Sequence, residues 1–175
     1  YSTMKFKTFL AGCLGGLLSL NSCTNSPDMT DYAAYVNPFI GTGGHGHTFP
    51  GAIVPHGMIS PSPDTRIDGW DACSGYYYAD STINGFSHTH LSGTGCCDYG
   101  DVLLMPTVGE QKYLPTGSQS QQMAYASAFS HQNETAEPGY YSVFLDTYQV
   151  KAELTASKRA AIHRYTFPAV SYTHL

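Results

Sequence analysis

Apolar and polar side chains alternate in three short runs near the carboxyl end of the sequence. Tyr141, Val143 and Leu145 are separated by single residues, and the same period of two recurs in residues 150–154 and 162–167. Successive side chains of an extended strand point to opposite faces, so this spacing predicts strands with one buried face. Residues typical of turns bound the runs. The three runs therefore predict an antiparallel meander.

Two further segments also have strand character, whereas helical periodicity is weak throughout. Residues 101–105 form a continuous apolar run before Pro106, which suits a strand buried on both faces, and residues 85–90 are a second candidate. Residues 111–133 are rich in Gln, Ser and Ala without a regular period, so we expect a long excursion with one helical turn there. The predicted fold class is all-β, an antiparallel β-sandwich that is incomplete at its carboxyl-terminal end.

The first 23 residues resemble a bacterial lipoprotein signal. A basic region at residues 4–7 precedes an apolar run at residues 9–20, and a small-residue cleavage site ends in Cys23. The apolar run is shorter than the roughly 20 residues of a membrane-spanning helix. We therefore expect an exported protein lipidated at Cys23, in the periplasm or at the outer-membrane surface, and attached to the membrane only by its lipid. An ordinary secretory peptide with an incidental cysteine is the alternative.

Composition gives the remaining boundaries. Residues 24–30 are small and polar and are expected to form a tether, followed by one folded domain at residues 31–169. Residues 170–175 resemble a translated sequencing adapter, which predicts a non-native tail on a truncated fragment. A native carboxyl terminus is the alternative.

The charge of the chain narrows the class of ligand. Only 12% of residues are charged, the formal net charge is -5, and there are 8 Lys and Arg residues in total. No basic stripe is available to neutralise phosphates, so nucleic acid is excluded as an expected partner. A neutral ligand such as a sugar agrees better with this balance.

A glycine-rich loop at residues 41–47 contains His45 and His47. Glycines permit positive φ and close approach of another group to the backbone. The two histidines either hydrogen-bond to neighbouring loops or contribute to a ligand or metal site. The loop lacks the Lys-Ser/Thr pair of a phosphate-binding loop.

Trp70 is the only tryptophan and is flanked by Asp68 and Asp71. Aromatic rings stack on the apolar faces of pyranoses, and carboxylates accept hydrogen bonds from sugar hydroxyls. This segment therefore suits a saccharide, with a core tryptophan as the alternative. Arg66 is expected either to orient Asp68 or bind sugar oxygens, or to form a surface ion pair.

His88 and His90 are two residues apart, so a strand would place both imidazoles on one face. They either face a sugar or brace the turn at residues 93–95, and a transition metal there would need a third protein ligand. Cys73, Cys96 and Cys97 remain after export, an odd number that leaves at least one cysteine without a partner in this chain.

Taken together, the segments at residues 36–52, 68–71 and 87–95 resemble the amino-terminal region of glycoside hydrolase family 92, the calcium-dependent exo-acting α-mannosidases. The resemblance runs from about Asp31 to about Ala169. It implies an amino-terminal β-sandwich that packs on an (α/α)6 barrel, which this chain does not contain, with the active site at their interface.

The resemblance also implies which residues face the substrate. By motif match, these are Trp70, Asp68, Asp71, His88, His90, Ser92, Gly93 and Thr94. The family inverts configuration, which requires an acid and a base about 6.5–9.5 Å apart. Both groups and most calcium ligands belong to the barrel, so no catalytic or metal-binding residue is assigned to this chain.

The function implied is therefore that of a substrate-shaping domain of an exo-α-mannosidase acting on mannose-containing glycans. We expect calcium in the full-length parent, no cofactor in this fragment, and no activity of the fragment alone. The alternative is a non-catalytic, surface-anchored carbohydrate-binding β-sandwich. A small metal-dependent hydrolase that uses the histidines is a third hypothesis.

Overall fold

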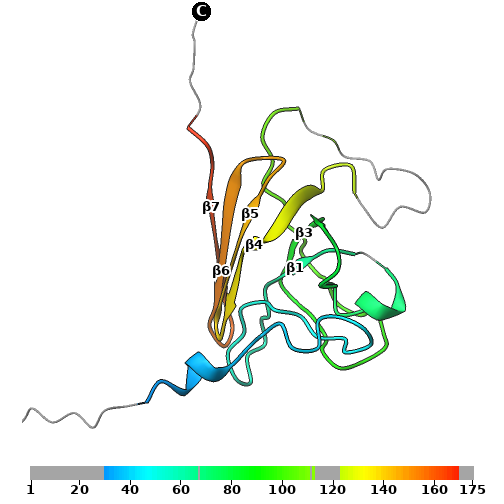
Figure 1. The fold of residues 1–175 in the computed structure, drawn as a ribbon, viewed down its shortest axis with the longest axis vertical. Helices are drawn as coiled ribbons and strands as arrows, with labels where there is room; N and C mark the ends of the chain where they lie inside the picture. Colours follow the sequence, from blue (N-terminus) through cyan, green and yellow to red (C-terminus); the bar gives the residue numbers. More distant parts are fainter. Residues whose placement is uncertain (1–29, 67, 111, 113–122, 170–175) are drawn as a thin grey trace, which may run out of the picture. The chain divides into compact units, whose positions relative to one another are not determined.

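The computed structural model describes residues 30–169 apart from residues 67, 111 and 113–122 (Figure 1). The predicted signal with Cys23, most of the tether and the tail at 170–175 lie outside the described residues. Residues 1–32 and 33–175 form separate units, and the fold below is that of the second. Within the described part of the chain, no helix has the length and apolar character needed to cross a membrane.

Two antiparallel sheets make up the fold and confirm the predicted all-β class. A two-stranded sheet pairs β1 with β3, and a five-stranded sheet has the order β2-β4-β5-β6-β7. Figure 1 shows the long strands of the second sheet side by side. The elements are η1 (Tyr32–Tyr35), β1 (Ser62–Asp64), η2 (Trp70–Ala72), β2 (Thr82–Ile83), β3 (Gly85–Ser87), β4 (Ser127–Glu137), β5 (Tyr140–Leu145), β6 (Val150–Ala156) and β7 (Ala161–Thr166).

The predicted meander is confirmed as β5, β6 and β7. Tyr141 pairs with Leu154, and Ala152 pairs with Tyr165, so the alternating apolar side chains of adjacent strands meet on one face. Phe86 from β3 packs into the same core, which joins the two sheets. The buried cluster consists of Ala52, Ile83, Phe86, Phe129, Tyr141, Val143, Leu145, Val150, Ala152 and Leu154.

The opposite face of the meander is mostly polar, with Phe144 and Ile162 as apolar exceptions. Glu153 on β6 receives two hydrogen bonds from Arg164 on β7 and one from the Tyr140 hydroxyl on β5. These donors favour the ionised carboxylate, with Arg164 first, and lower the pKa of Glu153 to about 2. A cross-strand ion pair thus fixes the register of the same strands whose other face forms the core.

The prediction of a long irregular segment at residues 111–133 is wrong from Ser127 onward, because β4 begins there. The pairing of β4 with β5 shifts register between Phe129 and Glu134. Such a bulge inserts unpaired residues and interrupts the alternation of buried and exposed positions. The irregular sequence pattern in this stretch is therefore that of a bulged strand.

The strand predicted at residues 101–105 is also wrong. Val102 has a φ of 57°, which breaks an extended backbone, and Leu104 forms only an isolated bridge with Phe86. Val102 is 67% exposed and Leu104 is 41% exposed. The candidate strand at residues 85–90 exists as β3 but ends at Ser87.

The carboxyl group of Glu134 is buried between three segments of the fold. It accepts hydrogen bonds from the hydroxyls of Tyr76 (3.0 Å to each oxygen) and Tyr141 (2.6 Å), and His131 Nδ1 lies 2.6 Å away. Burial, and then the Glu134 charge, raises the pKa of both tyrosines, so the hydroxyls remain protonated donors. The network connects the segment after Trp70 to β4 and β5.

We predict that Tyr76→Phe and Tyr141→Phe each lower the free energy of unfolding by about 1.5–3 kcal/mol, because each removes a hydrogen bond to a buried carboxyl group. Chemical denaturation of the full-length protein measures this change. Tyr35→Phe, at a residue that is 80% exposed, is the control and should stay within about 0.5 kcal/mol of the wild type. Equal stability of all four proteins would contradict the role given to Glu134.

Candidate functional site

The glycine-rich loop is held in one conformation by its own backbone. The Thr48 N–H donates to the Gly41 carbonyl, and the Gly46 N–H donates to the Gly43 carbonyl, both at 3.3 Å. A Cβ at position 46 would lie 2.1 Å from the Gly41 carbonyl oxygen, so only glycine fits between the two histidines. His47 has a φ of 53°, a conformation that costs about 1–3 kcal/mol and clusters at functional sites.

Trp70 lies on the short turn η2 and is 56% exposed, which favours the loop alternative over a core tryptophan. The turn follows Gly69, which has a φ of 101°. A Cβ at Gly95 would lie 2.4 Å from Trp70 Nε1, so the indole rests against the backbone of the loop at residues 93–95. The Cys73 thiol donates to the Thr94 carbonyl (2.7 Å) and connects the same two loops.

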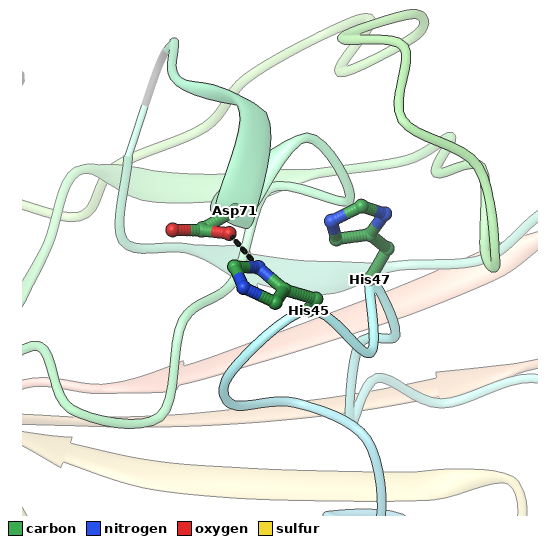
Figure 2. Close-up of side chains that lie close together, drawn as sticks. All are labelled: His45, His47 and Asp71. Atoms are coloured by element: carbon green, nitrogen blue, oxygen red, sulfur yellow. Dashed lines mark hydrogen bonds and ion pairs between the residues drawn. The ribbon is translucent and has the colours of Figure 1, made fainter.

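The glycine-rich loop and the Trp70 turn meet side chain to side chain. His45 Nδ1 lies 2.5 Å from Asp71 Oδ1, and Figure 2 shows His47 beside this pair. The Trp70 ring is 4.4 Å from the His47 ring, edge to face, and 5.0 Å from the His45 ring, centroid to centroid. The Gly93 N–H donates to the His47 carbonyl at 2.7 Å. Three segments that are distant in sequence thus form one cluster.

Polar atoms of this cluster face one another at a partly open surface. One nitrogen of each histidine and one Asp71 oxygen all lie within 4.8 Å of one another. The His47 residue is 7% exposed, and its Nε2 is buried without a hydrogen-bond partner among the described residues. The side chains of His45 and Asp71 are 73% and 39% exposed. The cluster can therefore bind a polar group or a cation next to the apolar face of Trp70.

Asp68, His90 and Ser92 line two hollows that share His90 and Tyr99. The first, with a volume of about 200 Å³, also contacts Asp68 and Cys73. The second, of about 380 Å³, also contacts Ser92. The structure thus brings Trp70, Asp71 and Gly93 together at the histidine cluster. It places Thr94 against Cys73 and sets Asp68, His90 and Ser92 around the hollows.

His88 and His90 do not share a strand face, because β3 ends at Ser87. The His90 side chain is 2% exposed; its Nδ1 donates to the Ser60 carbonyl (2.7 Å), and its Nε2 lies 2.9 Å from Asp64 Oδ1. These contacts connect His90 to β1 and to the segment before it. Its predicted substrate-binding role, like that of His88, stays a prediction.

His88 packs against the five-stranded sheet. Its ring stacks on His163 of β7 with centroids 4.6 Å apart, and its Nδ1 donates to the Val102 carbonyl (3.0 Å). Burial, and then the charge of His88, lowers the pKa of His163 to about 4, so that His163 is neutral at neutral pH. The two histidines of the predicted motif therefore make separate contacts.

Arg66 forms an ion pair with Asp80, which is one of the two alternatives for this residue, and none with Asp68 in the described chain. Its guanidinium donates three hydrogen bonds of 2.7–3.1 Å to the Asp80 carboxylate and lies over the Tyr77 ring at 4.4 Å. The Asp80 hydrogen bond raises the pKa of Arg66 further. This fork-shaped pair supports the loop that carries Trp70 from outside the cluster.

Cys73, Cys96 and Cys97 are free thiols. Burial, and then the nearby Cys97, raises the pKa of the Cys73 thiol, so it stays protonated and donates its hydrogen bond to Thr94. Cys97 donates a longer one to the Gly69 carbonyl (3.4 Å). Both contacts join the Trp70 turn to the following loop.

Residues 35–175 match the family model described as "Glycosyl hydrolase family 92 N-terminal domain". The chain belongs to glycosyl hydrolase family 92. The glycine-rich loop, the Trp70 turn and the loop at residues 93–95 all lie inside the matched region, so the cluster is part of this family's N-terminal domain.

Solved structures of family 92 share the fold. A GH92 α-mannosidase from Bacteroides thetaiotaomicron, in complex with mannoimidazole, is 48% identical with a TM-score of 0.73, covering 78% of this chain and 18% of that one. A GH92 inverting mannosidase from Bacteroides thetaiotaomicron VPI-5482 is 32% identical with a TM-score of 0.64, covering 82% of this chain and 19% of that one.

A curated relative likewise matches most of this chain with a small part of its own length. A protein of Arthroderma benhamiae described as an uncharacterized secreted glycosidase is 32% identical over 139 residues, which are 79% of this chain and 18% of that protein. The family 92 chain thus spans about a fifth of the length of these relatives.

Sequence reasoning named His45 and His47 but did not join them to Trp70 and Asp71. The available signal was the pair of histidines on either side of Gly46, a position that tolerates no side chain. The contact with Asp71 bridges 26 residues of sequence. No local pattern gives that distance, so the pairing required the fold.

We predict that His90→Ala lowers the free energy of unfolding by about 1–3 kcal/mol, because Asp64 Oδ1 loses its buried partner while Oδ2 keeps the Ser87 N–H. Denaturant unfolding of the full-length protein measures the change. His56→Ala, at an exposed histidine, is the control and should shift stability by less than about 0.5 kcal/mol. A stable His90→Ala protein with lost sugar binding would instead favour a direct substrate contact.

Proposed function

We propose that the chain is the substrate-shaping N-terminal domain of an inverting exo-α-mannosidase that acts on mannose-containing glycans. The observation that carries this proposal is an exposed tryptophan held rigidly beside a carboxylate and two imidazoles. The indole supplies an apolar face for a pyranose ring, and the polar groups can bind its hydroxyls. The mannosidase titles of similar structures support the choice of sugar.

The chemistry of bond cleavage is placed outside this domain. Inversion requires a general acid and a general base on opposite sides of the scissile bond. We propose that both belong to a C-terminal (α/α)6 barrel of the same protein, against which the loops of this domain close the sugar pocket. The domain then binds and orients, and the barrel transfers protons.

Calcium, which the family resemblance implies, does not fit the histidine cluster. Calcium takes six to eight oxygen ligands, whereas the cluster offers one carboxylate and two imidazoles. Calcium therefore has no role at this cluster, and we propose that its ligands lie in the barrel.

We predict that Trp70→Ala lowers kcat/KM for mannoside hydrolysis by the full-length protein about tenfold to hundredfold, because the stacking surface for the pyranose is lost. Mannose release measures the rate, and the anomer first formed, followed by NMR, tests inversion. Phe167→Ala removes an aromatic residue of similar exposure, 51%, and is the matched control. Equal effects of the two substitutions would contradict a sugar contact at Trp70.

A comparison of the 175-residue chain with the full-length protein tests the alternative of a non-catalytic carbohydrate-binding domain. A half-pocket should bind mannose only weakly and release none from a disaccharide on its own, since the barrel completes it. Strong mannose affinity of the 175-residue chain, together with no hydrolysis by the full-length protein, would favour the binding module.

We further propose export and a lipid anchor at Cys23, in the periplasm or at the outer-membrane surface. The secreted relative supports export, and the leader supports lipidation. We predict that Cys23→Ser moves the protein from the membrane fraction to the soluble fraction. Cys13→Ser is the control, because Cys13 lies inside the apolar run at residues 9–20 and cleavage there would leave that run too short. Unchanged fractionation of Cys23→Ser would contradict the anchor.

A further inference from the structure

We propose that His45, His47 and Asp71 form a binding site for a zinc-class transition-metal ion, at the same cluster to which the proposed function assigns the sugar contact. The three ligand atoms lie within 4.8 Å of one another (Figure 2). Two imidazoles and one carboxylate are the ligand types of zinc sites that keep an open position for water. This donor set favours zinc-class ions over magnesium or calcium, which prefer oxygen ligands.

The unpartnered nitrogen of His47 is the first specific support. Its Nε2 is buried without a hydrogen-bond partner in the described chain, and such a group costs about 1–3 kcal/mol unless something binds it. A metal ion bound to Nε2 removes that cost. The left-handed φ of His47 adds strain that the surrounding loop maintains.

Rigid support for the ligands is the second observation. Trp70 packs against both imidazoles, and the Gly93 N–H binds the His47 carbonyl. The glycine at position 46 allows the chain to turn tightly between the two histidines. Ligands that neighbouring groups hold in place bind a metal more tightly, because less ordering is needed on binding.

The separations agree with a tetrahedral ion after small movements. Metal bonds of about 2.0–2.1 Å hold tetrahedral ligand atoms about 3.4 Å apart. The His45–Asp71 pair is now closer, at 2.5 Å, and all three atoms lie within 4.8 Å. The side chains of His45 and Asp71 are 73% and 39% exposed, so they can separate without disturbing the buried His47, and the fourth position is left to water from the solvent side.

Isothermal titration of the metal-stripped full-length protein with zinc chloride tests the site, with excess calcium present to fill sites of oxygen ligands. We expect wild-type protein to bind zinc at the cluster with a stoichiometry of one. Loss of outer contacts typically weakens metal binding 10–100-fold, so removal of a ligand in His47→Ala or Asp71→Asn should weaken it by at least about 100-fold. His56→Ala removes an exposed histidine that also has a positive φ, and it should bind like the wild type.

Asp71→Asn nearly preserves shape at a partly exposed residue, so it keeps the test decisive if His47→Ala fails to fold. Cobalt provides a second readout: visible absorption of four-coordinate cobalt should appear in the wild type and be lost in Asp71→Asn. Absence of zinc binding by the wild type, or undiminished binding by Asp71→Asn, would overturn the proposal. The mannosidase proposal is tested separately by hydrolysis with Trp70→Ala, which keeps all three metal ligands, so failure of one proposal can be distinguished from failure of the other.

Discussion

The buried carboxyl group of Glu134 determines where the candidate site lies relative to the sheet. It holds Tyr76, six residues after Trp70, against Tyr141 of β5 through two hydroxyl donors. A carboxyl group in this position is costly to bury unless its partners are in place. The Trp70 turn and the five-stranded sheet are therefore stabilised together, and a change in one weakens the placement of the other.

Loops with little regular structure gain their rigidity from contacts of this kind. Gly46 and Gly95 allow approaches that any side chain would prevent, and the Cys73 thiol and Gly93 N–H join neighbouring loops by hydrogen bonds. Since no long strand runs through the described residues of this region, each contact replaces part of a missing sheet ladder. The result is an exposed indole with a fixed orientation, which a sugar-binding surface requires.

The sequence predicted those parts of the fold that depend on local alternation. Residues 141–145 lie on β5, residues 150–154 on β6, and residues 162–167 on β7 and the residue after it. These strands could be predicted because a period of two shows directly which face is buried. Prediction from the sequence failed where the backbone departs locally from a regular strand. The bulge of β4 conceals the alternation, and the positive φ of Val102 ends a run that composition alone assigns to a strand. The histidine cluster could not be predicted from the sequence, since Asp71 contacts His45 across 26 residues only through the fold.

The state of a buried histidine's hydrogen bonds separates residues that stabilise this domain from residues that can bind a ligand. His90 carries the residue type of a ligand but is satisfied by Asp64 and Ser60 in the interior, whereas His47 is buried with an unused nitrogen. A group whose hydrogen bonds are complete stabilises the fold, and a group with an unsatisfied atom has free energy to gain from a ligand. Ser62 Oγ and His163 Nε2 are also buried without a partner among the described residues, but His47 lies beside a second imidazole and a carboxylate. The surface formed by His45, His47, Trp70 and Asp71 can therefore bind a ligand.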